Sequence, residues 1–464
     1  MLRYKVLPGF RDANEAVRLG CGRGNANEMT HVHLGRLSEQ GSRAKVVLGF
    51  AQEIVTGVFG QRGSGKSYTL GTIIESLGAK DTEANIGINI GDRAVLLLDT
   101  LNIYPYSAKP VSKIPDVSLR EKLSKKNASF EIKETDVSTN IYYPEGRKQD
   151  FYTSIYKPFA LDTALIRPED YAHIFDIDLF KDPVGHLLQA AFDAVKNTGY
   201  SYNSISRAGK EEAGLVELIE YLSDETNTAD AFERTTIRAL RSRLQSLAQD
   251  RLFSSSPTSV SSIVKAGEVT ILLLGHLGPL KRSLIAAILI RQLFNLRSAA
   301  SEASKILKLD HTISENERAA AVKIIEDTPP RTLLCIDEAQ GYAPPSKANP
   351  CTSILIQYVK EGRNHGLSLM VTSQQPSAIH PEILSQMDCV IAHRLTVQPD
   401  IDAVIRNAQG RSPDKISSAT QTLSFHDLLR ELEQGQAYIS HGDAIRSFIT
   451  EIRPRVTAHG GIEA

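Results

Sequence analysis

The sequence Gly60-Gln61-Arg62-Gly63-Ser64-Gly65-Lys66-Ser67 lies between an apolar run at residues 54–59 and a segment of helical spacing at residues 68–77. Glycines allow a tight turn whose backbone N–H groups point at phosphate oxygens, and the start of the following helix favours an anion. Lys66 adds a positive charge, and the Ser67 hydroxyl can ligate Mg²⁺. The pattern therefore predicts a nucleoside triphosphate site. Its predicted contacts are Gly60, Gln61, Arg62, Gly63, Ser64, Gly65, Lys66, Ser67 and Tyr68.

The second part of the predicted site lies far downstream. Residues 332–336 form a short apolar run bounded by prolines at 329–330 and by a turn-rich segment at 341–345, which predicts a buried parallel strand. The run ends in Asp337 and Glu338. Neighbouring side chains at a strand end point in different directions, so Asp337 can hold Mg²⁺ while Glu338 faces an attacking water as general base. This pair favours hydrolysis over the chemistry of a small-molecule kinase.

A third apolar run, residues 367–372, ends in Ser373-Gln374-Gln375-Pro376. An amide at this strand tip can bond both a γ-phosphate and the attacking water, so we predict that Gln374 senses the state of the nucleotide. Between the two strands, residues 351–362 have helical spacing and lead to Arg363. We expect Arg363 near the strand ends, where an arginine can serve the nucleotide of a neighbouring subunit. A solvated charge at a helix end is the alternative interpretation.

Several further motifs, in consistent order along the chain, resemble the HerA branch of the HerA/FtsK ATPases. They are His33-Leu34-Gly35-Arg36-Leu37, Glu361-Gly362-Arg363-Asn364-His365-Gly366-Leu367, Ser373-Gln374-Gln375-Pro376-Ser377, Leu384-Ser385-Gln386, Arg394-Leu395-Thr396 and Pro454-Arg455-Val456-Thr457-Ala458-His459-Gly460-Gly461. The resemblance covers most of the chain except about residues 105–265. It implies a RecA-like P-loop core that works as a homo-hexameric ring, with ATP and Mg²⁺ at subunit interfaces and double-stranded DNA threaded through the centre.

The resemblance also implies roles at matching positions. Lys66 and Ser67 would bind nucleotide and Mg²⁺, and Gln374 would be the sensor. Asp337 and Glu338 would form the metal and water pair, and Arg363 would be a finger that acts on the neighbouring subunit's site.

Three features depart from the family pattern. Gln375 stands where the family usually has arginine, and Ile103 stands where the family motif after Asp99 usually has glutamate. The first departure puts the role of that arginine in doubt, and the second puts in doubt the role of the missing carboxylate. Only about 50 residues precede the phosphate loop, too few for a full β-barrel, so we expect a shortened strand arm instead.

Composition limits the remaining possibilities. The chain has 464 residues, which exceeds the size at which a single hydrophobic core stops growing. Its net charge is −1. A protein that coats nucleic acid with its whole surface is excluded, so any DNA contact has to come from a local stripe of charge. The cysteines show no paired metal spacing, and those at 335 and 389 lie in apolar runs where we expect burial. Without an apolar leader or a membrane-length apolar run, we expect a cytoplasmic protein with no membrane contact.

Five apolar runs are candidate strands of the core, at residues 54–59, 94–98, 269–274, 332–336 and 367–372. Each precedes a helix or a turn, which is typical of an α/β fold with a mostly parallel sheet and its ligand at the carboxyl edge. The long gap between Lys66 and Asp337 indicates an insertion, with candidate helices at 186–196, 214–222 and 231–248. We therefore divide the chain into a strand arm (1–50), a first core segment (51–160), a mainly helical insertion (161–260), a second core segment (261–445) and a C-terminal tail (446–464).

One basic pair has two interpretations. Lys281-Arg282 precedes a segment of helical period at 284–296. The pair can donate to DNA phosphates, or it can be a solvated charge at the start of a helix.

Two classes of function follow from these features. The first is an ATP-hydrolysing ring motor that translocates or unwinds duplex DNA, together with a nuclease or another effector, in DNA-end processing or anti-phage defence as the resemblance implies. The second is an ATP-gated scaffold ring that assembles or regulates an effector without processive movement. A monomeric GTPase is disfavoured because no Asn-Lys-x-Asp sequence for reading guanine is present.

Overall fold

The computed structural model describes the chain apart from several short ranges and the two ends. The ranges outside the description are 1–15, 22–28, 39–43, 150–151, 229–230, 255–256, 347–348, 410–414, 418–421, 445–446 and 462–464. Within the described residues, no helix combines the length and the apolar character that crossing a membrane requires.

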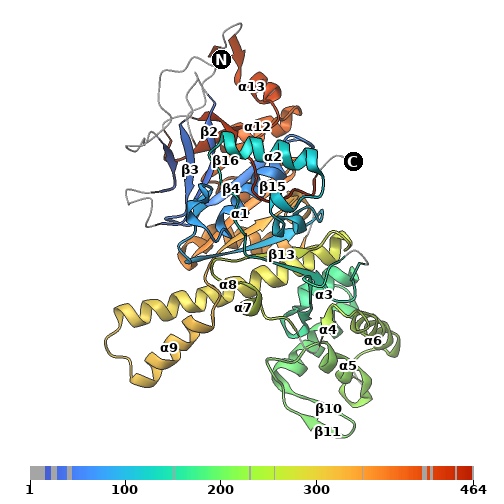
Figure 1. Cartoon of the computed structure of the whole chain (residues 1–464). Coiled ribbons are helices and arrows are strands. Elements are labelled where there is room, and N and C mark those ends of the chain that lie inside the picture. The colour runs from blue at the N-terminus through green and yellow to red at the C-terminus, as the bar shows by residue number, and fades with distance from the viewer. Residues whose placement is uncertain are drawn as a thin grey trace.

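One large mixed sheet forms the core, and its central part is parallel (Figure 1). Neighbouring strands run β16-β4-β15-β14-β6-β13-β7-β8, and every pair in this series is parallel. Their bounds are Cys389–Ala392, Val55–Phe59, Leu367–Ser373, Arg331–Ile336, Arg93–Asp99, Val269–Leu273, Thr139–Pro144 and Lys157–Phe159. The five strands predicted from apolar runs are therefore confirmed as β4, β6, β13, β14 and β15, and so is the α/β class with a mostly parallel sheet.

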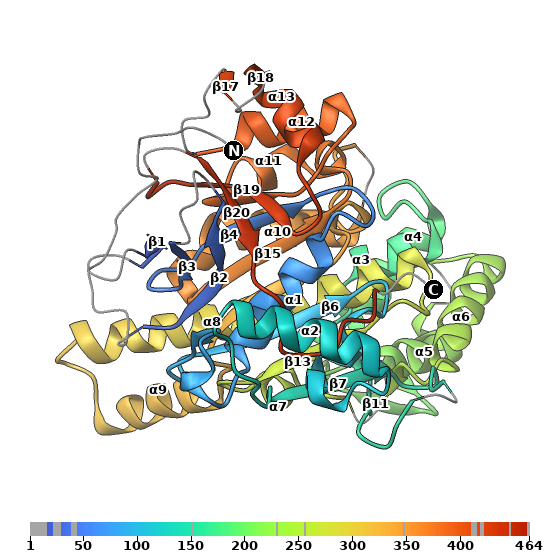
Figure 2. The same ribbon diagram turned by 45° about the horizontal axis from the view of Figure 1, so that its top comes forward.

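Antiparallel strands from both ends of the chain extend this sheet beyond β16. The order continues β16-β19-β20-β2-β3, and β1 completes the edge in parallel with β3. The bounds of the added strands are Gln436–His441 for β19, Phe448–Ile452 for β20, His31–Leu37 for β2, Lys45–Gly49 for β3 and Val17–Leu19 for β1. Strand β5 (Gly87–Ile88) also pairs with β2. The expected N-terminal arm and the expected C-terminal tail thus meet in one sheet (Figure 2).

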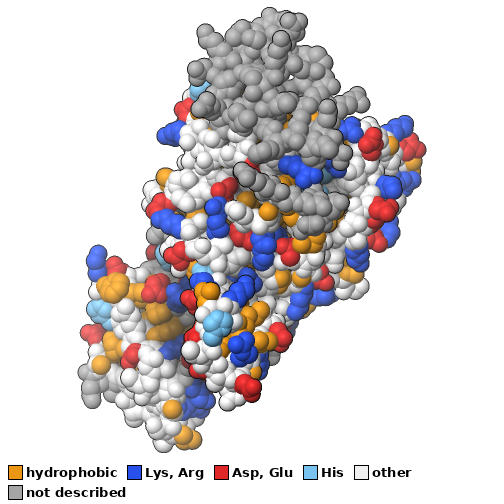
Figure 3. Space-filling view, turned by 90° about the vertical axis from the view of Figure 1, so that its left-hand side faces the viewer, with side chains coloured by type: hydrophobic (Ala, Val, Ile, Leu, Met, Phe, Trp, Pro, Cys, Tyr) orange, Lys and Arg blue, Asp and Glu red, His pale blue; other side chains and the backbone are white. Residues whose placement is uncertain are grey.

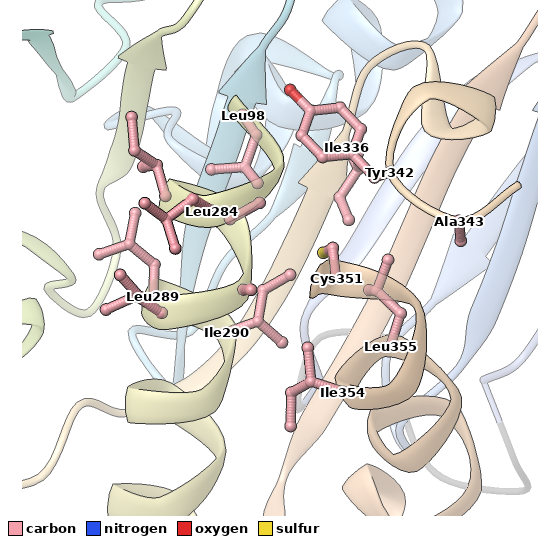
Figure 4. Packing of buried hydrophobic residues seen from close by; sticks show 14 of the residues in the cluster. Leu98, Leu284, Leu289, Ile290, Ile336, Tyr342, Ala343, Cys351, Ile354 and Leu355 are labelled. Atoms are coloured by element: carbon pink, nitrogen blue, oxygen red, sulfur yellow. The ribbon is translucent and has the colours of Figure 1, made fainter. Parts of the chain in front are cut away.

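The central strands are buried on both faces because helices cover each side. Along β6, Leu96 and Leu98 belong to one hydrophobic cluster, whereas Val95 and Leu97 belong to another. Helix α1 (Lys66–Leu77) covers the second face, and α8 (Pro279–Leu309) and α10 (Pro350–Glu361) cover the first. Figure 4 shows Ile290 of α8 lying toward Cys351 and Ile354 of α10, in front of the strands. All four cysteines are buried, as expected for Cys335 and Cys389.

Residues 161–260 form a mainly helical lobe beside the sheet (Figure 1). Its helices are α3 (Pro168–Phe175), α4 (Pro183–Asp193), α5 (Leu215–Ser223) and α6 (Arg234–Ala248), and a small hairpin joins β10 (Tyr200–Tyr202) to β11 (Ile205–Arg207). Helix α7 (Val260–Ile263) follows the lobe and leads to β13. The lobe shares the hydrophobic cluster of α8 and α10. A largely buried ion pair, with Arg291 Nη2 2.5 Å from Asp170 Oδ2, joins α8 to α3.

Helix α8 is much longer than the segment predicted at 284–296. It continues to Leu309 and, with α9 (Glu315–Asp327), forms a hairpin that projects from the body (Figure 1). This hairpin lies on the side of the molecule that faces the viewer in Figure 3. In this extension apolar periodicity is weak, because only Ala300, Ala303 and Ala321 are buried. Several apolar side chains are exposed among charged ones: Ile306, Leu309, Val322, Ile324 and Ile325. The helix propensity of its residues and its packing against α9, rather than an apolar stripe, stabilise this part of α8.

The chain after β20 packs on the helix that follows the phosphate loop. Glu75 of α1 is fully buried and receives Arg453 Nη1 at 2.6 Å and the backbone N–H of Val456 at 3.1 Å. Arg455 donates its backbone N–H to the Tyr68 hydroxyl at 2.7 Å. The C-terminal motif quoted above therefore fastens this segment to α1.

Candidate nucleotide-binding site

The loop between β4 and α1 has the geometry that its glycines permit. Gly63 and Gly65 have φ of 74° and 116°, in the left-handed region where side chains are rarely found, and Gly65 is the N-cap of α1. A Cβ on Gly60 would lie 2.3 Å from Ser64 Oγ and 2.8 Å from His393 Cβ, so this position has no room for a side chain. The loop therefore opens onto the N-terminus of α1, which suits a phosphate group.

Residues just after β16 support the loop from below. The imidazole of His393 lies 2.8 Å from Thr69 Oγ1 and 2.8 Å from the Gln436 carbonyl oxygen, and burial lowers the pKa of His393 to about 4. The Gln61 side-chain oxygen accepts from Arg394 Nε at 2.8 Å, and its amide nitrogen donates to Thr396 Oγ1 at 3.1 Å. His393 and Arg394 thus hold the two ends of the loop in place.

Lys66 and the carboxylate predicted to act as general base meet across the sheet. Lys66 Nζ lies 2.9 Å from Glu338 Oε1, and both side chains are nearly buried. Gln374 Nε2 donates to the same oxygen at 2.8 Å, and Gln340 Nε2 donates to Oε2 at 2.7 Å. Burial by itself would raise the pKa of Glu338, but Lys66 and the two amides outweigh it and hold the pKa below its ordinary value. Glu338 is therefore ionised at neutral pH and available to accept a proton.

The backbone of Glu338 is also unusual, with a φ of 56° outside glycine. Such a conformation is uncommon for a long side chain and occurs where the surrounding structure enforces it. Here Glu338 N donates to Thr372 Oγ1 at 3.2 Å, which ties the turn after β14 to the neighbouring strand β15. The turn aims the Glu338 carboxylate at Lys66.

Asp337 is fully buried at the end of β14, and one of its oxygens is unsatisfied. Thr372 Oγ1 donates to Oδ1 at 2.6 Å, whereas Oδ2 has no hydrogen-bond partner among the described residues. Burial raises the pKa of Asp337 to about 6. Asp99, fully buried at the end of β6, has a pKa raised to about 7 by burial and by the nearby Asp337. Two buried carboxyl groups side by side favour a cation between or beside them.

These residues fit a triphosphate with Mg²⁺. The unpartnered Asp337 Oδ2, the half-buried Ser67 on the first turn of α1 and the open loop 60–65 are the groups that would hold them. Tyr104 is fully buried, and its hydroxyl has no hydrogen-bond partner among the described residues. Of the other predicted contacts, Arg62 is exposed on the loop, and Tyr68 is half-buried with its ring 5.4 Å from that of His459.

Arg363 lies at the other edge of the sheet. It belongs to the short helix Gly362–His365 that precedes β15, and its Nη2 contacts Asp388 Oδ1 and Oδ2 at 2.8 and 2.9 Å. Asp388 Oδ2 in turn accepts from the N–H of Val55, the first residue of β4. Arg363 is thus near strand ends, as expected, but these are the amino ends, whereas the phosphate loop follows the carboxyl end of β4.

A pocket of about 290 Å³ surrounds this arginine. Its lining includes Arg363, Asn364, Asp388, Gln386 and Glu53. The Arg363 side chain is 56% exposed, so it can reach a molecule that approaches this edge.

Two of the three departures from the family pattern, at Gln375 and Ile103, have simple structural settings. Gln375 is exposed, and its backbone N–H donates to Ser373 Oγ at 2.9 Å. Asn102, which precedes Ile103, has a φ of 54°, and its Oδ1 accepts from the N–H of Gly275 at 3.1 Å. Asp99, with both oxygens accepting backbone N–H groups from residues 101, 103 and 104, shapes this turn without a neighbouring glutamate.

Sequence reasoning assigned no role to four residues that shape the site: Asp99, Thr372, Gln340 and His393. Asp99 and Thr372 end strands that flank β14, so their position next to Asp337 follows from strand order and not from any local motif. Gln340 and His393 each lie within two residues of a motif that was recognised. Their position next to a predicted strand tip is the signal in the sequence that indicates them.

Comparisons with known proteins add an independent result. A family model described as "Helicase HerA, central domain" matches residues 32–293, more than half of the chain. The DNA double-strand break repair helicase HerA of Pyrococcus furiosus is 24% identical over 267 residues, which cover 53% of this chain and 48% of the relative. A probable DNA double-strand break repair helicase HerA of Methanocaldococcus jannaschii is 33% identical over 112 residues, 22% of each chain. The chain therefore spans about half, or less, of the length of these curated relatives.

Among solved structures, VirB4 of Thermoanaerobacter pseudethanolicus aligns with a TM-score of 0.49 and 16% sequence identity, covering 91% of this chain and 96% of that one. The plasmid coupling protein TrwB, in complex with ADP and Mg²⁺, aligns with a TM-score of 0.36 and 10% identity, covering 85% of this chain and 93% of that one.

Proposed function

Because the chain is a P-loop ATPase of the HerA family, with residues 32–293 matching that family's central domain, we propose that it is the motor subunit of an oligomeric ring that moves along duplex DNA. In this proposal ATP and Mg²⁺ bind between the phosphate loop of one subunit and the Arg363 edge of the next. The ring is a homo-hexamer in the form that the family resemblance implies.

The observation that carries the proposal is the separation of Arg363 from its own phosphate loop. Strand β4 spans Val55–Phe59 between the two edges, on the order of 15 Å at about 3.3 Å a residue. This distance exceeds the reach of an arginine side chain. An arginine that serves ATP hydrolysis from this position has to act on a different subunit.

The residues of one subunit divide the remaining work. Lys66 would leave Glu338 to bind the phosphates, and Ser67 and Asp337 would hold Mg²⁺, which would neutralise charge on the phosphate oxygens. Glu338 then accepts a proton from the attacking water, and Gln374 orients that water. Because Gln374 is bonded to Glu338 before nucleotide binds, release of Lys66 changes the partners of both residues together.

Mixing two inactive variants tests the shared site. Arg363→Ala removes the arginine, and Glu338→Gln removes the base. A mixed ring contains sites in which an intact Glu338 faces an intact Arg363, so turnover should recover in part. Absence of any recovery, in rings shown to contain both variants, would contradict the assignment of Arg363 to the neighbouring site.

The alternative is an ATP-gated scaffold ring, which the net charge of −1 keeps in consideration. The two functions differ in their response to DNA. A motor should hydrolyse ATP faster with duplex DNA and displace a protein roadblock from it, whereas hydrolysis indifferent to DNA would favour the scaffold. We extend both forms to an effector partner such as a nuclease, in DNA-end processing or anti-phage defence, on the strength of the family resemblance.

A further inference from the structure

Helix α6 of the helical lobe has a one-sided composition. Its 15 residues, Arg234–Ala248, include arginines at 234, 238, 241 and 243 and no acidic residue. The whole chain, by contrast, has 53 basic and 54 acidic residues. A helix this basic in a protein of balanced charge is a local concentration of positive charge.

The arginines on α6 are arranged on distinct faces. Arg234, Arg238 and Arg241 are spaced i, i+4 and i+7, so they form one stripe along the helix. Leu240, Leu244 and Leu247 form the buried face on another side. Arg243 lies about half a turn away from the stripe. We call the first three residues the arginine stripe of α6.

The stripe faces solvent at the outer side of the lobe. Figures 1 and 2 both show α6 at the edge of the molecule, away from the central sheet. Arg234 and Arg238 are exposed, and Arg241 is half-buried. A large ligand can therefore approach α6 without displacing another element of the described chain.

The charges of the stripe are barely neutralised within the protein. Arg234 lies 3.9 Å from Glu225, and both side chains are at least 80% exposed. So long and exposed an ion pair neutralises little of the charge of Arg234. Within the described residues, Arg238 and Arg241 make no hydrogen bond or ion pair with any side chain. Like charges at i and i+4 repel one another, so the stripe favours an external polyanion.

The acidic residue that follows α6 is already engaged elsewhere. Asp250 Oδ2 lies 2.9 Å from Arg147 Nη2 and 2.6 Å from Lys281 Nζ. It therefore neutralises these two cations and not the stripe. Lys281, one of the two candidate DNA contacts in the sequence, is thus bound to a carboxylate, whereas Arg238 and Arg241 have no such partner among the described residues.

We propose that the arginine stripe of α6 binds the sugar–phosphate backbone of duplex DNA outside the ATP-binding core. From Arg234 to Arg241 the helix rises by about 10 Å, a length along which a duplex presents about six phosphate charges. Three guanidinium groups can each donate to such phosphates without reading sequence. This inference rests on the proposed function, because it supplies that motor with a contact to its track.

The test compares the full-length protein with variants of matched charge. The stripe variant carries Arg234→Gln, Arg238→Gln and Arg241→Gln. The control variant carries Lys305→Gln, Lys308→Gln and Lys323→Gln on the α8–α9 hairpin, where exposed lysines are interspersed with acidic residues. Both variants have three positive charges fewer than the wild type. Binding of a fluorescent duplex of random sequence is measured by anisotropy over a series of salt concentrations.

The stripe variant should bind the duplex about tenfold or more weakly at physiological salt, and the slope of log affinity against log salt should fall by about one for each phosphate that is no longer bound. The hairpin control should bind like the wild type. Replacing the stripe by lysines should preserve most of the binding, since the interaction depends on charge. As a single-site comparison, Arg238→Gln should weaken binding more than Arg243→Gln on the other face.

The outcomes separate this inference from the proposed function. Equal binding by the stripe variant and the hairpin control would overturn the stripe while leaving the motor in place if DNA still stimulates the ATPase. Wild-type protein that neither binds duplex DNA nor responds to it would overturn the motor itself. ATP hydrolysis without DNA should be unchanged in the stripe variant, and a loss there would indicate damage to the fold and count against a DNA-specific role.

Discussion

The two edges of the parallel sheet treat buried charge in opposite ways. At the carboxyl edge, Asp337 has an oxygen without a hydrogen-bond partner among the described residues, Asp99 lies beside it, and burial raises the pKa of both carboxyl groups. The backbone of Glu338 has a positive φ. Within the described part of the chain, Lys66 is the only cation that forms an ion pair with Glu338. This edge is electrostatically incomplete in the protein alone.

At the amino edge, a buried carboxylate is fully bonded. Glu53 receives Arg93 Nη1 at 2.5 Å, Arg331 Nη2 at 2.5 Å and Ser368 Oγ at 2.6 Å. Burial alone would raise the pKa of Glu53, but the two arginines and the serine lower it below its ordinary value. The same sheet thus leaves a carboxyl oxygen unsatisfied at the edge beside the phosphate loop, whereas two arginines and a serine satisfy the Glu53 carboxylate at the other edge.

The largest effect should come from breaking the amino edge. Arg93 is fully buried, so Arg93→Met leaves Glu53 with one cation fewer in a site closed to water. Loss of one partner of such a pair costs about 3–5 kcal/mol of unfolding free energy. Urea unfolding of the two proteins measures it. Adding Glu53→Gln should recover part of the loss, and a cost below about 1 kcal/mol would show that the edge is not the stabilising one.

At the carboxyl edge, replacing the general base should lower the rate of ATP turnover and leave the unfolding stability nearly unchanged. Glu338→Gln keeps an amide oxygen near Lys66 but cannot accept a proton, so ATP turnover should fall roughly a hundredfold or more while nucleotide binding persists. Lys66→Ala should instead abolish binding. Calorimetric titration with a nucleotide analogue and a phosphate-release assay measure the two properties separately. Equal loss of binding in both variants would contradict this division of roles.

The contrast between the edges also explains which features could be read from the sequence. The strands β4, β6, β13, β14 and β15 are continuous apolar runs, because burial on both faces removes polar alternation. The glycines of the phosphate loop carry their own backbone requirement. Both signals are local, so the sequence predicts both features.

Features that depend on strand order could not be read in this way. Strand β15 lies between β4 and β14, which is why Gln374 reaches Glu338, and β6 lies on the other side of β14, which brings Asp99 to Asp337. No local pattern states that order. Arg363 lies at the amino edge because it precedes β15 and does not follow it, and this placement also depends on the fold of the whole sheet. The C-terminal strands β19 and β20 are antiparallel, and the α/β pattern gave no reason to expect them.

A smaller effect should follow from pH at the carboxyl edge. With a pKa of about 6, Asp337 is mostly ionised at pH 7 and mostly protonated at pH 5, whereas an ordinary aspartate would be ionised at both. Mg²⁺-dependent nucleotide affinity should therefore fall about tenfold from pH 7 to pH 5. A fluorescent ATP analogue titrated with and without Mg²⁺ measures it.

Stability should change in the opposite direction over this range. A carboxyl group whose pKa is raised by folding contributes stability at low pH that is lost as pH rises through its folded pKa, here about 6. In nucleotide-free protein this contribution should disappear in Asp337→Asn. Affinity for Mg²⁺-nucleotide that stays flat between pH 5 and pH 7 would mean that Asp337 is ionised throughout and that the carboxyl edge is less strained than its burial implies.

The smallest predicted effect is the change in unfolding stability on replacing Arg363, whose ion pair at the amino edge is exposed and not buried. This residue lies at the satisfied edge, yet its side chain is 56% exposed, and its contacts with Asp388 are open to water. An exposed pair contributes little, so Arg363→Ala should change the unfolding free energy by less than about 1 kcal/mol. Arg331→Ala on the same edge provides the control, because it removes a partner of the buried Glu53 and should cost more. If Arg363→Ala proves as destabilising as Arg331→Ala, the arginine belongs to the structural framework of its own subunit, and the neighbouring site loses its proposed arginine.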